Sequence, residues 1–317
     1  MTTDVSSNNS LSVVRKLSEL YSDKKKEYGS EYSSHWKERV ADIEIANLNG
    51  AISISGRGFG EFTGIEKARS LYYRLKSIPT KLFILRMLRN CDSNHIKKSK
   101  EIISQMGKAY TYDDARMVLT INTVSKFIDN FDGATVAIIG DGYGGLGCLL
   151  KSIFPHVRII QINLGEVLTF DAHYTGKVYP EFEHKLITKD SLELCKDFNY
   201  LEASKIRELD IQADVFFNIV SMGEMTLDTV ENYFKILRQQ RSNVYFYCCN
   251  RLSKRHPDGY VINFADYGWL KSDHVLLDEL CPWHQRAPRN RPPFYYRFDG
   301  PIQHKLISID TTIDKTE

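Results

Sequence analysis

The stretch that decides the fold is IIGDGYGGL, from Ile138 to Leu146. It continues the short apolar run Val136–Ile139 and leads into a helical pattern over Leu146–Ile153. Glycines let the backbone turn tightly and approach a ligand closely, and the start of a helix offers free amide groups. A glycine-rich turn between a buried strand and a helix therefore predicts a nucleotide site, with a tight turn that binds nothing as the simpler alternative.

Two classes of cofactor fit the glycines of this turn. Gly140, Gly142 and Gly145 match the GxGxxG pattern of dinucleotide-binding folds. Gly140, Gly142 and Gly144 match the GxGxG pattern of methyltransferases that use S-adenosylmethionine (SAM). Both classes expect an acidic residue at the end of the second strand, on the ribose hydroxyls, and this chain has Asn163 there. The glycines alone leave a nicotinamide (NAD(P)) enzyme and a SAM enzyme both open.

Strands and helices alternate on the C-terminal side of the turn. Besides Leu146–Ile153, a helix is expected over Asp228–Arg241, opened by a cap of the form Asp228-x-x-Glu231. Strands are expected at the apolar runs 136–139, 157–162, 186–188, 214–220 and 243–249. The segments 294–298 and 302–309 are typical of an antiparallel hairpin. This order predicts a doubly wound α/β sheet with a terminal hairpin.

The N-terminal part of the chain has a different character. Residues 1–12 form a polar tail that we expect to be disordered, and residues 13–115 form a mainly helical region. The α/β domain is expected to occupy the rest, residues 116–317. Within the N-terminal region the pattern predicts the following elements: helix at 13–47, a short strand at 51–54, a turn at 56–60, helix caps at 63–66 and 111–114, and helices at 82–88, 96–106 and 115–128.

Composition and charge exclude several classes of protein. The 317 residues carry 42 lysines and arginines against 40 aspartates and glutamates, a formal net charge of +2, which argues against a protein that coats nucleic acid. No apolar run approaches the roughly 18 residues of a membrane span, and the N-terminus lacks a signal-peptide pattern. The six cysteines contain no CxxC pair, so we expect reduced thiols, a cytoplasmic protein and no metal site.

Four stretches in the second half of the chain resemble one family, the sugar O-methyltransferases, which are bacterial class I SAM-dependent enzymes. The stretches are IGDGYGGLGCLL (139–150), INLGEVL (162–168), FFNIVSMGEMTLDTVENYF (216–234) and YFYCCNR (245–251). The resemblance implies a Rossmann-like domain with a seven-stranded sheet that ends in an antiparallel hairpin. Two positions depart from the family: Ile138 and Asn163 stand where it usually carries carboxylates.

The same resemblance implies SAM as the cofactor and S-adenosylhomocysteine (SAH) as its product. The glycine turn would hold the methionine and ribose side of SAM, Asn163 and Leu164 the ribose and adenine, and Asp190 the adenine amine. The full set of expected cofactor contacts is Gly140, Asp141, Gly142, Tyr143, Gly144, Gly145, Asn163, Leu164, Asp190, Asn218, Ser221 and Met222.

Methyl transfer to a hydroxyl needs a group that removes the hydroxyl proton, because SAM already supplies an activated methyl. Glu224 follows the fourth expected strand, where such a fold places its active site, although it would equally stabilise the start of the next helix. His173 and His284 are the other candidates for the base, each with a structural role as its alternative.

The segment around His284 is rich in proline, arginine and aromatic residues, which suits a lid over a sugar. Trp283 offers a stacking face, and Arg286 and Arg289 can pair with an anionic acceptor. A solvated loop explains the same composition.

These observations favour a SAM-dependent O-methyltransferase that acts on a sugar hydroxyl in the synthesis of a bacterial surface glycan, such as lipopolysaccharide, O-antigen or capsule. The expected partners are a sugar or glycan acceptor, a second copy of the chain, or other proteins of glycan assembly. Two alternatives remain: an NAD(P)-dependent oxidoreductase that uses the same glycines, and a catalytically degenerate Rossmann-like binding protein.

Overall fold

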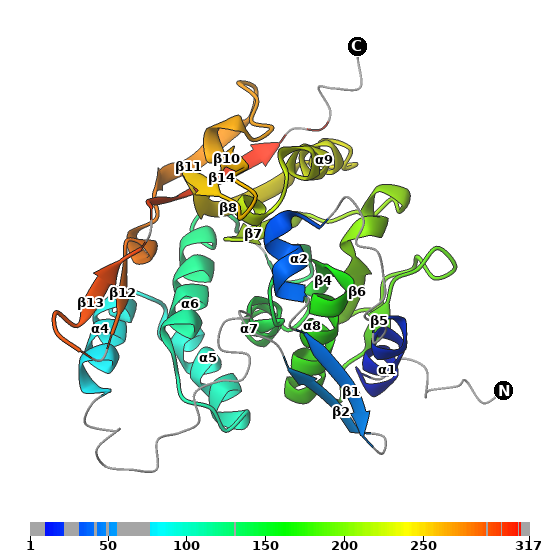
Figure 1. The fold of residues 1–317 in the computed structure, drawn as a ribbon, viewed down its shortest axis with the longest axis horizontal. Coiled ribbons are helices and arrows are strands. Elements are labelled where there is room, and N and C mark those ends of the chain that lie inside the picture. Colours follow the sequence, from blue (N-terminus) through cyan, green and yellow to red (C-terminus); the bar gives the residue numbers. More distant parts are fainter. Residues whose placement is uncertain are drawn as a thin grey trace.

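The computed structural model describes residues 10–21, 32–40, 43–48, 51–55, 77–129, 131–289, 291–298, 300–309 and 311. An eight-stranded sheet lies at its centre, in the order β11-β14-β8-β7-β3-β4-β6-β5 (Figure 1). The strands are β3 (Thr135–Ile139), β4 (Arg158–Asn163), β5 (His184–Leu186), β6 (Phe198–Glu202), β7 (Val215–Ile219), β8 (Val244–Arg251), β11 (His274–Leu280) and β14 (Ile302–Ile309).

Strand β14 alone runs against the others in this sheet. It pairs antiparallel with β8 on one side and with β11 on the other, and the remaining pairs are parallel. The order of the strands reverses at β3, because the chain proceeds from β3 to β4 on one side and later returns to β7 on the other. In open parallel sheets a ligand binds at such a reversal, beyond the carboxyl ends of the strands.

The central strands are mainly apolar because both faces of the sheet are covered there. In β3 every residue is buried; Val136 and Ile138 point into one core while Ala137 and Ile139 point into the other. Three helices cover the first face, with three more outside them: α6 (Tyr112–Val124), α7 (Gly145–Ile153) and α8 (Gly165–Val178), then α1 (Ser10–Tyr21), α4 (Ile78–Leu88) and α5 (Ser93–Gln105). The second face is covered by α9 (Leu227–Arg238) and the 3₁₀ segment η2 (Ala203–Glu208).

This architecture is a Rossmann-like α/β fold, as the alternation of strands and helices predicts. Short elements complete it: α2 (Ser34–Val40), the hairpin β1 (Glu44–Leu48) and β2 (Ala51–Ser55), the ribbon β9 (Ser253–Arg255) and β10 (Val261–Asn263), the ribbon β12 (Arg286–Pro288) and β13 (Tyr295–Arg297), and η3 (Met222–Glu224), η4 (Phe264–Asp266) and η5 (Pro282–His284). Within the described residues, no helix has the length and apolar character that crossing a membrane requires.

The terminal hairpin is built from different residues than the sequence pattern suggests. Segment 294–298 does not pair with β14; its strand β13 is exposed and pairs with β12 instead. The antiparallel neighbour of β14 on its outer side is β11. Strand β11 is mostly exposed, and its register shifts between Val275 and Leu277, so it lacks the clean alternation by which the sequence pattern could have revealed it.

The third expected strand is also displaced, and the sheet gains an eighth member. The run predicted at 186–188 corresponds to the edge strand β5, and the inner strand is β6. The polar residue Asn199 interrupts the apolar pattern of β6, yet its amide is satisfied inside the sheet by bonds to Ile159 O and Cys195 O. Because a buried, hydrogen-bonded asparagine breaks the apolar pattern, the sequence pattern did not reveal β6 as a strand.

Several N-terminal predictions are corrected as well. The helix expected over 13–47 is divided into α1 and α2, and β1 begins at Glu44; α1 itself begins at Ser10, inside the expected tail. The capping box of Thr111 and Asp114 is confirmed, whereas α9 is capped by Thr226 rather than by Asp228. Residues 1–9, the turn at 56–60 and the cap at 63–66 lie outside the described residues. The division into an N-terminal region and a domain stays a prediction.

Candidate functional site

A pocket lies at the carboxyl ends of the central strands, between the sheet and α9. It contains about 830 Å³ of empty space, part of which is open to solvent. Its walls come from the ends of β3, β4, β6 and β7, from α9 and from α2, and include Gly140, Asn163, Leu164, Ser204, Ser221, Tyr233 and Trp36. Gly140 follows β3 and Ser221 follows β7, so the pocket lies where the strand order reverses between these two strands.

Three glycines of the turn after β3 have left-handed backbones, with φ of 76° at Gly140, 85° at Gly142 and 83° at Gly144. Two of them are required by packing: a Cβ on Gly140 would lie 2.4 Å from Ser221 Oγ, and one on Gly144 would lie 2.8 Å from Thr175 Cγ2. A Cβ on Gly142 would meet no atom of the described residues within 4 Å. Gly142 therefore leaves open space for a ligand to approach the backbone.

The other residues of the turn face the protein interior. Tyr143 is buried and packs its ring edge against Tyr174, with ring centroids 5.0 Å apart. A Cβ on Gly145 would lie 2.7 Å from the Tyr143 ring. Tyr143 and Gly145 thus pack on the interior side of the turn, and neither residue lines the pocket.

Asp141 caps the helix that follows the turn. Its carboxylate accepts hydrogen bonds from Leu146 N at 3.0 Å and Gly147 N at 2.9 Å. Burial raises the pKa of Asp141 to about 6, although these amide bonds oppose the shift. The carboxylate points at α7, so it serves the helix start rather than the pocket.

Asn163 lines the pocket, but its side-chain amide is already engaged. Its Oδ1 accepts a hydrogen bond from Leu164 N at 3.1 Å, and its Nδ2 donates one to Asp171 Oδ2 at 3.0 Å. Burial raises the pKa of Asp171 well above its usual range, and the charge of Asp141 adds to this shift. An aspartate at position 163 would face the Asp171 carboxyl group, so the amide suits this buried position better than a carboxylate.

Asn218 and Met222 are fully buried and hold the turn after β7. Asn218 donates from Nδ2 to Ile139 O at 2.9 Å and accepts at Oδ1 from Met222 N and from Asn250 Nδ2. Ser221 Oγ donates to Ile139 O at 3.0 Å and also lines the pocket. Of the three residues expected here to contact the cofactor, only Ser221 lines the pocket.

Glu224 does not itself line the pocket, although its neighbour Met225 does, and it meets a histidine from the N-terminal region. Its Oε1 is 3.3 Å from His35 Nε2, and the two side chains are 21% and 11% exposed. The carbonyl of Glu224 accepts a hydrogen bond from Ser33 Oγ at 2.5 Å. The structure therefore pairs one expected catalytic residue with a partner that the sequence analysis missed.

The segment 32–40 reaches this position because it packs on the start of α8. Tyr32 OH donates to Glu166 Oε2 at 2.6 Å, and burial together with the Glu166 charge raises the pKa of Tyr32, so its proton stays in place. The apolar residues Val40, Leu164 and Val167 pack beneath it. Helix α2 thus lies over the strand ends in Figure 1 and places Trp36 in the pocket wall.

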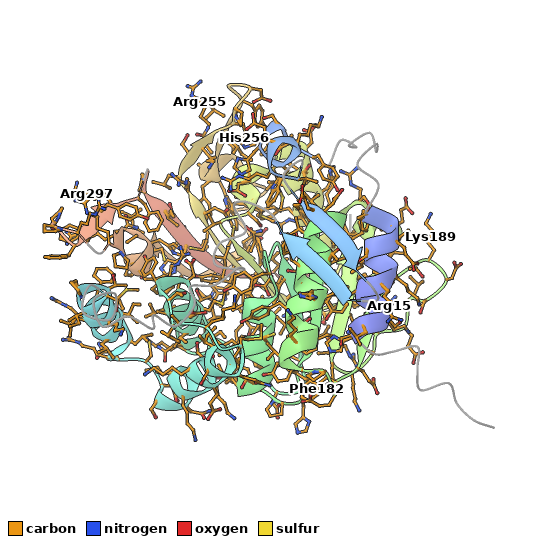
Figure 2. All side chains as sticks on the ribbon, turned by 60° about the horizontal axis from the view of Figure 1, so that its bottom comes forward. Arg15, Phe182, Lys189, Arg255, His256 and Arg297 are labelled. Atoms are coloured by element: carbon orange, nitrogen blue, oxygen red, sulfur yellow. The ribbon has the colours of Figure 1, made fainter. Side chains whose placement is uncertain are left out.

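A further histidine, His256, lies beside the pair of His35 and Glu224. Its Nε2 is 2.9 Å from Gly223 O, and its ring lies 6.5 Å from that of His35. Figure 2 shows His256 beside α2. No local pattern marks His35, Trp36 or His256 in the sequence, because their neighbours at the site are distant along the chain.

The two other histidines proposed as bases do not reach the pocket. His173 is half-buried on α8, and burial lowers its pKa to about 4, with Lys177 adding to the shift. His284 is 1% exposed and faces Cys249 and Cys281. Burial lowers the pKa of His284 well below its usual value, helped by the charge of Arg116.

The expected lid lies elsewhere, since none of the described residues between 281 and 298 lines the pocket. Trp283 is only 8% exposed and packs edge-on against His304, so its face does not offer a stacking surface. Arg286 and Arg289 are exposed on the ribbon of β12 and β13, which lies beside α4 at one end of the molecule (Figure 1). The Arg286 guanidinium covers the Tyr295 ring, and Arg289 Nη2 donates to Pro292 O.

Asp190 is likewise remote from the pocket. It is exposed in the turn between β5 and β6, next to Lys189, which Figure 2 shows at the outer edge of the molecule. The displaced third strand accounts for this error. Because β6 is the inner strand, Ala203 and Ser204 at its end take the place that the sequence pattern assigned to Asp190.

No protein-family model and no curated protein sequence matches the chain. Solved structures with similar folds include Thermoplasma acidophilum 1320, at 9% identity and a TM-score of 0.43, with 69% of this chain and 98% of that one covered. Magnesium protoporphyrin IX methyltransferase from Synechocystis PCC 6803 with bound SAM matches at 10% and 0.39, covering 76% and 99%. Coclaurine N-methyltransferase bound to N-methylheliamine and SAH matches at 10% and 0.39, covering 67% and 74%. Each likeness is one of overall fold, and function rests on the residues of the pocket.

Proposed function

We propose that the protein binds SAM in this pocket and transfers its methyl group to a hydroxyl of a sugar acceptor. The observation that carries the proposal is the place of the pocket: it joins the glycine turn at Gly140 to Ser221 in a sheet whose strand β14 runs antiparallel between β8 and β11. That sheet is the arrangement expected of class I methyltransferases from the sequence resemblance. The support for a sugar hydroxyl is the resemblance itself, and we place the reaction in the cytoplasmic synthesis of a surface glycan.

The residues of the pocket fit the parts of SAM. Leu164, Ala203 and Tyr233 provide apolar walls for an adenine ring, and Trp36 adds an aromatic side chain. Ser204, Ser221 and Asn232 provide polar groups near them. The open space at Gly142 admits the remainder of the ligand to the backbone. When bound, SAM supplies an activated methyl group, so the protein needs to supply only positioning and proton removal.

His35 and Glu224 supply the proton acceptor in this proposal. If His35 Nε2 donates its hydrogen to Glu224, Nδ1 carries the lone pair and can accept the proton of an acceptor hydroxyl. The Glu224 carboxylate then stabilises the imidazolium that forms and keeps the ring oriented. The acceptor would bind beside this pair, and the β12–β13 ribbon takes no part.

A ligand panel followed by thermal unfolding tests the cofactor. SAM and SAH should raise the unfolding temperature, because a ligand at one hundred times its Kd stabilises the native state by about 2.7 kcal/mol, whereas NAD and NADP should leave it unchanged. Stabilisation by NAD or NADP alone would make the protein an oxidoreductase. A response to none of the four would make it a binding protein without this cofactor.

A further inference from the structure

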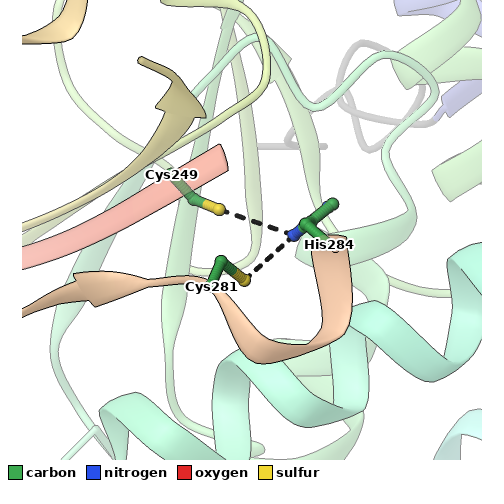
Figure 3. Close-up of side chains that lie close together, drawn as sticks. All are labelled: Cys249, Cys281 and His284. Carbon is green, nitrogen blue, oxygen red and sulfur yellow. Dashed lines mark hydrogen bonds between the residues drawn. The ribbon is translucent and has the colours of Figure 1, made fainter. Parts of the chain in front are cut away.

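Two cysteines and a histidine meet in the interior, away from the pocket. Cys249 lies on β8, Cys281 follows β11, and His284 ends η5 (Figure 3). His284 Nδ1 is 3.1 Å from Cys281 Sγ and 3.6 Å from Cys249 Sγ, and the three atoms lie within 4.8 Å of one another. The residues are 0%, 0% and 1% exposed, so the cluster is closed to solvent.

The two thiols face each other in a geometry that does not suit a disulfide. Strand β14 lies between them: Cys249 is opposite His304, and Cys281 N donates to Ile302 O at 2.8 Å. Two strand spacings separate their backbones by about 9–10 Å. A disulfide needs Cα atoms within about 7 Å, so the sulfurs can converge on a common ligand but not on each other without backbone movement.

The donor set and the charges favour a divalent, thiophilic ion. Two thiolates and an imidazole are the ligands that Zn²⁺ takes in three-residue protein sites, with a fourth position left for another donor. Two thiolates also cancel the charge of a divalent ion. The half-buried cation beside the cluster, Arg116, is already paired with Asp113, so the pair adds no net charge. The polar groups around it include Tyr112 and Tyr247, whose hydroxyls are bonded to Arg286 O and His304 Nδ1.

We propose that Cys249, Cys281 and His284 bind one thiophilic metal ion of the Zn²⁺ class. Each thiol gives up its proton to solvent on binding, so two protons are released for each ion, and the imidazole binds as the neutral ring. The ion fastens η5 to β8 and thereby the base of the β12–β13 ribbon to the sheet. The carbonyl of Cys249 also accepts a hydrogen bond from Val220 N at 2.7 Å, so the ion supports the strand end that carries Ser221.

The first experiment measures metal content and cobalt uptake in tag-free protein purified without chelators. The wild type should contain about one equivalent of zinc by mass spectrometry when grown in zinc-supplemented medium. After removal of zinc, Co²⁺ should produce the near-ultraviolet charge-transfer absorption of cobalt–thiolate bonds, which surface histidines cannot produce. A wild type that neither contains zinc nor gives this absorption would overturn the proposal.

Variants assign the site to these residues. Cys249→Ala should weaken Co²⁺ binding by about a hundredfold or more, because even second-shell losses cost ten- to hundredfold. The matched control is Cys248→Ala, since Cys248 is the next residue, is equally buried, and belongs to the core on the other face of the sheet. If Cys249→Ala fails to fold, the same Co²⁺ titration is carried out on His284→Gln, which lacks the imidazole ligand. Wild-type affinity in either folded variant, or an equal loss in Cys248→Ala, would remove these residues from the site.

Discussion

A single amide stands at the end of the second strand of the sheet, where the sequence pattern predicts an acidic residue. Asn163 pairs with Asp171, and burial raises the pKa of Asp171 while the neighbouring Asp141 charge raises it further. A carboxylate at 163 would place a third carboxyl group beside Asp141 and Asp171, which are both buried. The residue that the sequence pattern predicts to contact the ribose is, in the structure, the partner of a buried acid.

The Asp171 carboxyl makes stability depend on pH in a predictable direction. Its pKa in the folded protein lies above the unfolded value of about 3.9, so its contribution is fully present below about pH 4 and is lost as pH rises through the folded pKa. Asp171→Asn removes this loss and should become more stable than the wild type by an amount that grows with pH. Urea unfolding from pH 4.5 to 8 measures this difference in the free energy of unfolding. If that free energy varies with pH in the same way for both proteins, the prediction is wrong.

Glu224 and His35 form the second prediction at this scale. Glu224→Gln and His35→Asn should each lower turnover by roughly a hundredfold or more while SAH affinity is kept, because they remove proton acceptance rather than cofactor contacts. The assay follows SAH release with an acceptor found by screening sugars. His173→Asn is the control, since His173 is a half-buried histidine that belongs to α8 and not to the Glu224–His35 pair. If Glu224 only holds α2, Glu224→Gln will lower stability and leave turnover unchanged.

Gly142 provides a third test because a matched glycine exists elsewhere. Gly142 and Gly259 have φ of 85° and 89°, and a Cβ on either would meet no atom of the described residues within 4 Å. Valine at either position strains the backbone to the same extent. Gly142→Val should weaken SAH binding roughly tenfold or more, and Gly259→Val should not. Equal SAH affinities in isothermal titration would show that the glycine turn is not the cofactor site.

At the scale of elements, α1 and α8 pack unusually closely because two glycines face α1. A Cβ on Gly165 would lie 2.1 Å from the Tyr21 ring, and one on Gly176 would lie 2.4 Å from Ser10 Cβ. These glycines stand at the two ends of α8, so α1 rests on it along its length. The N-terminal helix is therefore part of the packed structure that supports α8.

The substitution Gly176→Val should push α1 away from α8, because the valine side chain would clash with Ser10. Overpacking at a close helix interface costs about 1–3 kcal/mol, and the loss should appear as faster amide exchange in α1 than in the sheet. Gly223→Ala is the comparison, because its Cβ would find only ordinary contacts, the closest at 3.8 Å from Asn250 Oδ1. Unchanged exchange in α1 of the folded Gly176→Val variant would mean that the helices separate without cost.

The elements also show how far the sequence could predict this fold. Apolar runs located β3, β4, β7 and β8, and the glycines located the turn, because these signals lie within a few residues of one another. Strand β6 was missed because Asn199 is satisfied by distant backbone groups. The site was predicted in part for the same reason: Gly140 and Ser221 follow recognisable strands, whereas His35 meets Glu224 only after the chain has folded.

At the scale of the whole molecule, the N-terminal and C-terminal parts of the chain are joined at one edge of the sheet. Tyr32 binds the start of α8, and Ser33 and His35 bind Glu224. The metal cluster likewise joins residues of β8, β11 and η5, which no short-range motif could reveal. The proposed site and the proposed metal cluster both consist of residues that are remote in the chain, and a domain boundary between residues 115 and 116 stays a prediction.

The place of β14 has a consequence for the order in which the protein can form on the ribosome. Strands β8 and β11 leave the ribosome before Ile302–Ile309, the segment that joins them. Until that segment appears, both strands expose an edge of unpaired backbone groups, the kind of surface that recruits chaperones or aggregates. A message with a stop codon before Ile302 would therefore direct synthesis of a chain with two adhesive edges, which quality control should degrade rather than release as a partly active enzyme.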